Sequence, residues 1–183
     1  MPSRRRAGAE GRRRQKGMRF GVVGTGFWAR ETHAAALVAH PDADLVGVWG
    51  RSFTRAAELA ETVGAQAYER ADDMFADVDA VAFAAPPDVQ AALAVRAATH
   101  GCHLLLDKPL AFTTEDADRV VEAVDRAGVR SLVFFTSRFT ANQADWLTDV
   151  QQTSDWSSGY VRMYGSIFEP GNPFGESPWR RSR

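Results

Sequence analysis

The chain has a single cysteine, Cys102, among 183 residues, and no apolar run long enough to span a bilayer. One cysteine excludes an internal disulfide and is typical of a reducing compartment, so we expect a cytoplasmic protein without membrane association. The apolar run after Cys102 predicts a buried thiol, with a reactive thiol as the alternative. Only four histidines are present, and the spacing of His40, His100 and His103 does not suggest a metal site.

The chain also has little net charge, because 22 basic residues stand against 23 acidic ones. Ten of the basic residues lie in residues 1–17 and 180–183, where Glu10 is the one acid, which leaves 12 basic and 22 acidic residues between these ends. An acidic body is a poor ligand for nucleic acid, so no specific nucleic-acid partner is expected. The basic head lacks apolar periodicity and is predicted to be disordered; contact of its arginines with nucleic acid or anionic lipid is the alternative.

Between these ends, short apolar segments typical of strands alternate with segments of helical periodicity. The predicted strands are Arg19–Val23, Ala43–Trp49, Ala67–Tyr68, Asp79–Ala84, His103–Asp107 and Val129–Phe135. Nearly continuous apolar strands separated by helices indicate a parallel sheet covered by helices on both faces. The predicted fold class is therefore α/β, with a doubly wound parallel sheet.

The segment after the first strand, residues 24–29, has the G-x-G-x-x-G/A pattern of a Rossmann dinucleotide-binding turn. The first glycine permits the tight turn, and the second lets a pyrophosphate approach the backbone. Ala29 is small enough for the next helix to pack on the strand, and the N–H groups that begin this helix attract phosphate. A plain tight turn is the alternative interpretation. The predicted pyrophosphate-binding residues are Gly24, Thr25, Gly26, Phe27 and Trp28.

Ligands of such sheets bind beyond the carboxyl ends of the strands, so residues at those ends should line one crevice. After the second strand, Gly50 stands where NAD sites usually carry an acid that binds the ribose. Arg51 can instead pair with a 2′-phosphate and Ser52 can donate a hydrogen bond to it, so NADP(H) is favoured over NAD(H). The alternative is a solvated Arg51 and a Ser52 that only caps the next helix. The other predicted cofactor-binding residues are Ala85, Pro86 and Pro109.

These motifs, in this order, resemble the glucose–fructose oxidoreductase/inositol dehydrogenase (Gfo/Idh/MocA) family. The resemblance covers roughly residues 18–180 and rests on the glycine turn, Ala85-Pro86-Pro87, Asp107-Lys108-Pro109 and Arg138-Phe139. It implies a Rossmann domain followed by an α/β substrate domain, and often a homo-oligomer. It also implies hydride transfer between a nicotinamide cofactor and a small-molecule substrate, a sugar, polyol or related hydroxyl or carbonyl compound.

The family commonly has Glu-Lys-Pro where this chain has Asp107-Lys108-Pro109. The resemblance places Lys108 near the reacting carbon, where an ammonium group can hydrogen-bond the substrate oxygen and ease proton movement. Asp107 would hold or bias that lysine, and a cis peptide bond before Pro109 would fix the local path. A surface lysine is the alternative. Gln90 stands where many members carry a histidine, and since it cannot take a proton it is assigned no catalytic role.

We divide the chain into a disordered basic tail (1–17), an NAD(P)-binding Rossmann domain (18–137) and the beginning of a truncated substrate domain (138–183). In the last segment, Tyr160–Phe168 is predicted to be a strand and Asn172–Trp179 a substrate loop. The resemblance places the partners of the lysine beyond a Trp-Arg pair like Trp179-Arg180, and so outside this sequence. Three functions therefore stay open: an NAD(P)-dependent oxidoreductase, a catalytically incomplete dinucleotide-binding fragment without turnover, and a nucleic-acid or membrane-associated protein that uses the basic head.

Overall fold

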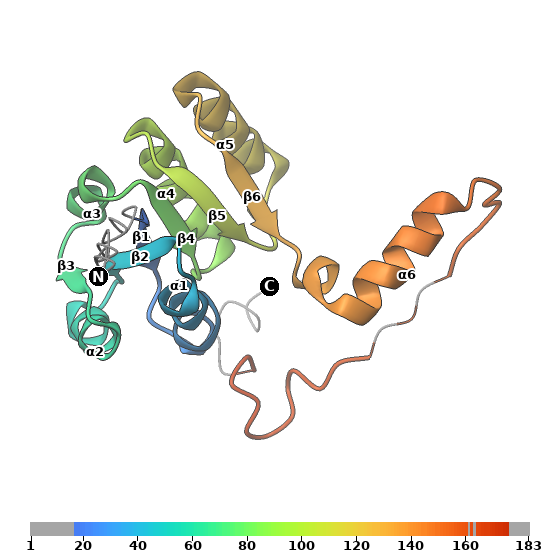
Figure 1. Ribbon diagram of the computed structural model, residues 1–183, viewed down its shortest axis with the longest axis horizontal. Helices are drawn as coiled ribbons and strands as arrows, with labels where there is room; N and C mark the ends of the chain where they lie inside the picture. Colours follow the sequence, from blue (N-terminus) through green and yellow to red (C-terminus); the bar gives the residue numbers. More distant parts are fainter. Residues whose placement is uncertain (1–16, 161, 163, 176–183) are drawn as a thin grey trace, which may run out of the picture.

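A computed structural model describes residues 17–160, 162 and 164–175 of the chain. Most of the predicted basic tail and the Trp179-Arg180 pair lie outside these residues. Six parallel strands form one sheet in the order β3-β2-β1-β4-β5-β6 (Figure 1). The strands are β1 (Met18–Val23), β2 (Ala43–Trp49), β3 (Gln66–Tyr68), β4 (Ala80–Phe83), β5 (His103–Asp107) and β6 (Ser131–Phe134). All six predicted strands are present, and the predicted doubly wound α/β fold is confirmed.

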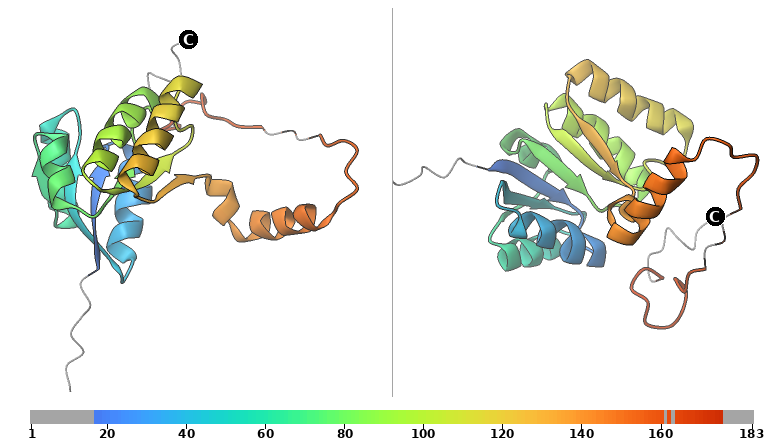
Figure 2. Two further views of the ribbon diagram at one scale, coloured as in Figure 1. Left: turned by 90° about the horizontal axis from the view of Figure 1, so that it is seen from above. Right: turned by 45° about the vertical axis from the view of Figure 1, so that its right-hand side comes forward.

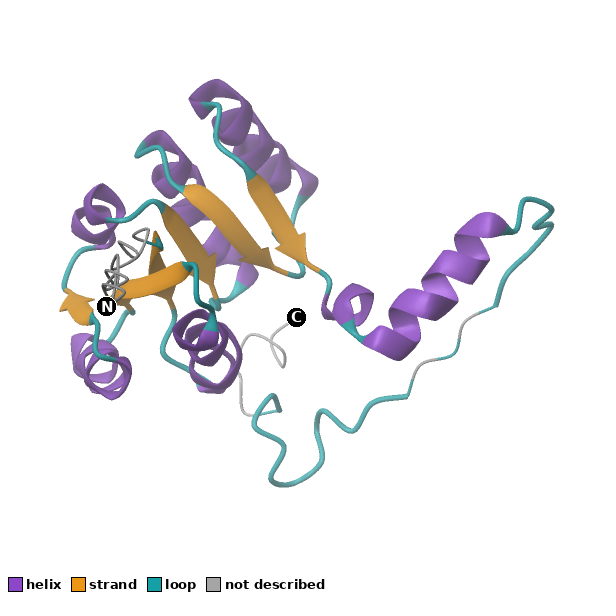
Figure 3. Ribbon diagram, viewed as in Figure 1, coloured by secondary structure: helices purple, strands orange, loops and turns teal. Residues whose placement is uncertain are grey.

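Helices connect the strands and cover both faces of the sheet (Figure 3). The helical segments are η1 (Ala29–Ala34), α1 (Ala35–Ala39), α2 (Phe53–Val63), α3 (Ala71–Asp77), α4 (Pro87–Thr99), α5 (Thr114–Ala127), η2 (Thr136–Phe139) and α6 (Ala141–Gln152). Two of these helices begin with side-chain caps. The Ser52 hydroxyl accepts a hydrogen bond from the Arg55 N–H at 3.5 Å, and the Thr113 hydroxyl accepts one from the Asp116 N–H at 3.1 Å.

The core forms two apolar layers, because successive residues of the central strands point to opposite faces of the sheet. Val23, Val81 and Phe83 pack with α3, α4 and α5, whereas Val22 and Ala82 pack with η1, α1 and α2. Each of these five side chains is fully buried. Burial on both faces explains why the strands read as nearly continuous apolar runs.

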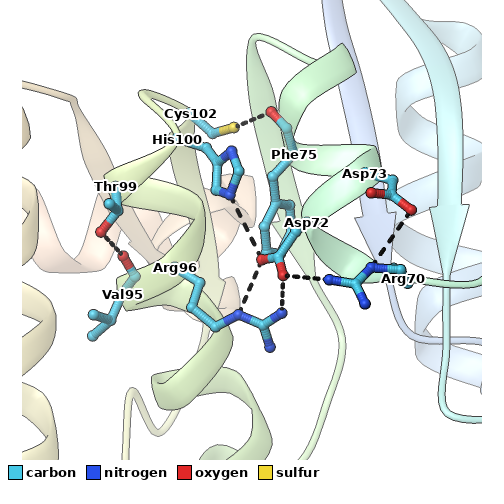
Figure 4. Close-up of polar contacts among 9 residues, drawn as sticks. All are labelled: Arg70, Asp72, Asp73, Phe75, Val95, Arg96, Thr99, His100 and Cys102. Carbon is cyan, nitrogen blue, oxygen red and sulfur yellow. Dashed lines mark hydrogen bonds and ion pairs between the residues drawn. The ribbon is translucent and has the colours of Figure 1, made fainter.

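An ion-pair network joins α3 to α4 on the first of these faces (Figure 4). The Asp72 carboxylate accepts two hydrogen bonds from the Arg96 guanidinium, at 3.1 and 2.6 Å, and lies 3.6 Å from His100 Nε2. These contacts, with the hydrogen bond from Arg96 as the largest cause, lower the pKa of Asp72. Nearby, the Cys102 thiol donates to the Phe75 carbonyl at 3.2 Å, and burial raises its pKa to about 11. The prediction of a buried thiol is thus confirmed, and this network is structural.

Beyond the sheet, α6 points away from the other helices, and the chain then returns in a long loop toward α1 (Figure 2). The prediction of a strand over Tyr160–Phe168 is wrong for the described residues of that segment. A strand needs a neighbouring strand to pair its backbone, and none lies beside this segment within the described residues. Without a neighbouring strand to pack on, the aromatic side chains of Tyr160, Tyr164 and Phe168 are exposed. Within the described part of the chain, no helix is long and apolar enough to cross a membrane.

Candidate dinucleotide site

A cavity of about 650 Å³ opens at the carboxyl edge of the sheet, where β1, β2, β4 and β5 end. Its volume lies in the range typical of small-molecule and cofactor sites. Eleven of the twelve predicted site residues line this cavity: Gly24, Thr25, Gly26, Phe27, Trp28, Arg51, Ser52, Ala85, Pro86, Asp107 and Lys108. Pro109, the twelfth, does not line it. The fold thus brings together side chains that lie more than 80 positions apart in the sequence.

The glycine turn after β1 is shaped to leave its outer surface open. Gly24 has a φ of 127°, and a Cβ there would collide with the Ala84 carbonyl, so only glycine fits. Gly26 differs, because a Cβ at this position would have no neighbour within 4 Å. The fold itself therefore does not require glycine at 26, and the space above it is free for a ligand that approaches the backbone.

The helix after this turn begins at Phe27, directly beside the open surface of Gly26. The Arg30 N–H donates to the Gly26 carbonyl at 3.1 Å, and Ala29–Ala34 continue as a π-helical segment before α1. Such wider turns are uncommon and frequently occur at functional sites. Free N–H groups and the positive end of the helix dipole make such a turn favourable for an anion.

At the end of β2, two arginines face the cavity and no acid is present. Arg51 and Arg55 are both exposed and line the cavity, and neither forms an ion pair with any of the described residues. Gly50 packs tightly, since a Cβ there would lie 2.6 Å from Thr25 Cγ2. The Ser52 hydroxyl accepts its capping hydrogen bond, which leaves its own proton available for donation. This corner of the cavity suits a phosphate monoester.

Gln90 on α4 holds the loop that carries Lys108. Its fully buried side chain accepts from the Asp107 N–H at 2.9 Å and donates to the carbonyls of Asp107 and Leu110 at 2.9 and 3.0 Å. The same amide lies 3.3 Å from the Pro109 carbonyl, and the Lys108–Pro109 peptide is cis. One side chain thus fixes both ends of the Asp107–Leu110 loop.

Lys108 lines the cavity, and none of the described residues forms an ion pair with its ammonium group. The Asp107 carboxylate accepts the Lys108 backbone N–H at 2.8 Å and forms no side-chain ion pair with it among the described contacts. Asp107 therefore orients the backbone of Lys108 and leaves its side chain available. Lys108 is one of two lysines in the sequence, the other being Lys16.

Behind the cavity wall, the His33 ring packs against Trp28 and Phe134, with ring centroids 6.3 and 5.9 Å away. His33 is 3% exposed, and this burial lowers its pKa although the charge of Asp107 opposes the shift. The imidazole is therefore neutral near pH 7. Its Nε2 and the indole Nε1 of Trp28 are buried without a hydrogen-bond partner in the described structure. His33 does not line the cavity and is placed to pack.

Sequence reasoning did not assign several residues that line the cavity: Arg55, Val89, Ile167, Pro173 and Phe174. Arg55 could have been assigned from the sequence. It lies one helical turn after Ser52, so it is expected on the same side of the helix as Arg51 and Ser52, toward the cavity. Pro173 and Phe174 lie in the predicted substrate loop Asn172–Trp179, of which residues 172–175 are described, although neither was assigned to the cofactor cavity. Val89 looks like an ordinary helix residue and Ile167 lies in the segment predicted to be a strand, so these two carried no signal.

The chain belongs to the GFO_IDH_MocA family, described as the oxidoreductase family with an NAD-binding Rossmann fold. The family model matches residues 18–135, more than half of the chain. Among curated relatives, UDP-N-acetylglucosamine 3-dehydrogenase of Acidithiobacillus ferrooxidans is 36% identical over 104 residues, which are 57% of this chain and 32% of the relative.

Solved structures of this fold include complexes with both forms of the cofactor. KijD10, a 3-ketoreductase from Actinomadura kijaniata in complex with NADP and TDP-benzene, is 26% identical with a TM-score of 0.68, over 74% of this chain and 42% of that one. GenD2 from gentamicin A biosynthesis, in complex with NAD, is 30% identical with a TM-score of 0.61, over 64% and 34%. The chain spans about a third to a half of the length of the curated relatives that it matches.

Proposed function

We propose that the chain binds a nicotinamide dinucleotide in the cavity at the carboxyl edge of the sheet. The open surface of Gly26 beside the helix start is the observation that carries this proposal. A pyrophosphate can approach the backbone there without displacing any described atom, and the first N–H groups of the helix supply donors for it. The residues present therefore fit the cofactor of the family.

We further propose that NADP(H) is preferred to NAD(H). Arg51 and Arg55 give this corner of the cavity two unpaired positive charges, and the Ser52 hydroxyl adds a donor. A 2′-phosphate would pair with these groups, whereas the ribose hydroxyl of NAD would find no carboxylate to accept its hydrogen bonds. The relatives themselves do not decide the preference, since solved neighbours contain NADP in one case and NAD in another.

The activity we propose for the family site is hydride transfer between the cofactor and a hydroxyl or carbonyl carbon. A bound nicotinamide supplies the hydride chemistry. The ammonium group of Lys108 hydrogen-bonds the substrate oxygen and moves the proton that accompanies hydride transfer. Asp107 orients the Lys108 backbone through the hydrogen bond at 2.8 Å, and Gln90 keeps the loop in place.

A sugar, polyol or sugar nucleotide is the substrate class that we assign. The curated relative is named a UDP-N-acetylglucosamine 3-dehydrogenase, and the NADP-bound structure is named a 3-ketoreductase. We assign residues 138–183 to the beginning of the substrate domain. The buried thiol of Cys102 and the absence of any other cysteine support a cytoplasmic location.

A dinucleotide-binding unit without turnover is the second candidate, and one observation favours it. The titratable side chains that line the described cavity are Arg51, Arg55, Asp107 and Lys108. Arginine does not deprotonate, so Lys108 and Asp107 are the two groups there that can exchange a proton, and the Asp107 carboxylate already accepts the Lys108 backbone N–H. Binding of the cofactor is common to both candidates, so it is tested first.

Calorimetric titration of the 183-residue chain with NADP⁺ and NAD⁺ tests the common step. Gly26→Val places a branched side chain in the pyrophosphate space and should weaken binding of both at least tenfold, about 1.4 kcal/mol. Gly159→Val is the matched control, because a Cβ at 159 also meets nothing within 4 Å and lies outside the cavity. Unchanged affinity in a folded Gly26→Val variant, or an equal loss in the control, would contradict the assignment.

A further inference from the structure

The loop that returns from α6 places an aromatic side chain on the glycine turn. The Phe174 ring lies edge-on to Phe27, with centroids 5.7 Å apart at an angle of 87°, and 5.6 Å from Trp28 at 62°. Ile167 and Pro173 of the same loop also line the cavity. In Figure 1 this part of the chain, drawn in red-brown, passes below α1. A segment more than 130 positions away thus contributes to the wall around residues 24–28.

Internal hydrogen bonds give this loop a defined shape. The Asn172 side chain donates to the Ser166 carbonyl at 3.1 Å and accepts from the Phe174 N–H at 3.0 Å. The backbone N–H groups of Asn172 and Gly175 donate to the carbonyls of Glu169 and Asn172, at 3.1 and 3.0 Å. Asn172 therefore ties the two ends of the turn together and fixes the position from which Phe174 reaches the cavity.

The position of Phe174 leaves the predicted phosphate path free. Its ring contacts the side chains of Phe27 and Trp28, while the space above Gly26 contains no atom within 4 Å of a Cβ placed there. An aromatic ring that blocked the site would lie over Gly26. Phe174 instead lines the cavity beside the turn, in contact with Phe27 and Trp28 and outside the space above Gly26.

We propose that Phe174 closes the dinucleotide cavity beside the glycine turn, against Phe27 and Trp28, and slows release of the bound cofactor. The proposal rests on the proposed function. Phe174 is a positioning residue, because it acts through Phe27 and Trp28, whose backbone groups begin the helix at the pyrophosphate. Edge-to-face aromatic pairs add to the energy of simple burial, so loss of both contacts should be measurable in the affinity for the cofactor.

The test compares NADP⁺ affinity and NADPH release in the 183-residue chain and two variants. Phe174→Ala should raise the Kd for NADP⁺ about tenfold, which corresponds to about 1.4 kcal/mol, and most of the change should be faster release in stopped-flow fluorescence. Phe174→Tyr keeps the ring and should stay close to the parent. Tyr164→Ala is the control, because this ring is 81% exposed and lies over Arg162 rather than in the cavity.

Amide hydrogen exchange provides a second readout that does not depend on activity. NADP⁺ should slow exchange in residues 166–175 of the parent and of Tyr164→Ala, and should not do so in Phe174→Ala. A parent that binds no dinucleotide would contradict the proposed function. A parent that binds while Phe174→Ala keeps its affinity, release rate and protection would overturn the role of Phe174 alone. Tighter binding by Phe174→Ala would make Phe174 a competitor of the cofactor and would also overturn it.

Discussion

At the scale of single residues, two features at the end of β2 disfavour an acidic side chain. Gly50 has no space for a Cβ, and Arg51 and Arg55 make the neighbouring cavity positively charged. Gly50 cannot become aspartate unless the Thr25 methyl group moves, since the two would approach to 2.6 Å at the Cβ alone. Arg51 and Arg55 follow one turn apart on the cavity side. The preference between a 2′-phosphate and a 2′-hydroxyl on the cofactor is therefore best tested at Arg51. This side chain is exposed, so a substitution there meets no steric conflict.

The parent chain should bind NADP⁺ at least tenfold more tightly than NAD⁺, because a hydrogen bond to a charged group contributes about 1.5–3 kcal/mol. Arg51→Asp should reverse this preference by repelling the 2′-phosphate and accepting hydrogen bonds from the ribose. Arg55→Ala should reduce the preference without reversing it. Arg130→Asp, at the opposite end of the sheet, is the control and should leave the ratio of the two dissociation constants unchanged. Equal affinities in the parent would show that both arginines are only solvated.

At the scale of elements, the site depends on a contact between α4 and the loop after β5. The fully buried side chain of Gln90 makes this contact. Its amide oxygen accepts one hydrogen bond from the loop, and its amide nitrogen donates hydrogen bonds to carbonyls of the same loop. The glutamine shows that this position shapes the loop, since a buried amide with several hydrogen bonds rigidifies what it contacts.

Gln90→Leu keeps the volume and removes every one of these hydrogen bonds. It removes the partner of the part-buried Asp107 N–H and the amide donor that the loop carbonyls share, so we expect a loss of about 2 kcal/mol in the free energy of unfolding. Gln66→Leu, on the exposed surface of β3, is the matched control and should change it by less than about 0.5 kcal/mol. Urea unfolding followed by circular dichroism measures both. A Gln90→Leu variant as stable as the control would mean that the loop is held by other contacts.

Sequence patterns predict some of the helices and strands of this fold but not others. The strands were predictable because they are buried on both faces, and the helix starts at Ser52 and Thr113 because capping is local chemistry. Tyr160–Phe168 has the composition of a strand, but strand formation depends on partners that composition does not supply. The π-helical turn at Ala29–Ala34 was likewise not predictable, since its sequence has ordinary helical residues.

At the scale of the whole molecule, the location of the site followed from topology. Parallel strands end at one edge, so residues after β1, β2, β4 and β5 could be grouped before their contacts were known. Phe174 and Gln90 could not be grouped in this way. One reaches the cavity by the return of a loop and the other acts through hydrogen bonds to backbone groups, and neither arrangement leaves a period or motif in the sequence.

Among the described residues that line the cavity, only Lys108 and Asp107 can exchange a proton, and this sets the expectation for turnover. The 183-residue chain should bind NADPH but oxidise or reduce a panel of sugars and polyols slowly, because a missing acid–base group costs about 10²–10⁴-fold in rate. Lys108→Ala should abolish the remaining turnover while leaving the Kd for NADP⁺ within about threefold, since we place Lys108 at the substrate and not at the pyrophosphate. Absorbance of the reduced nicotinamide and calorimetry measure the two effects.

Lys16→Ala is the control for this last prediction, because Lys16 is the one other lysine in the chain. It should change neither turnover nor affinity. Rapid turnover that persists in Lys108→Ala would refute both the role of Lys108 and the expectation of slow chemistry. A large loss of NADP⁺ affinity in Lys108→Ala would instead place its ammonium group on the cofactor phosphates. The two readouts together therefore decide whether Lys108 acts on the substrate oxygen, on the cofactor or on neither.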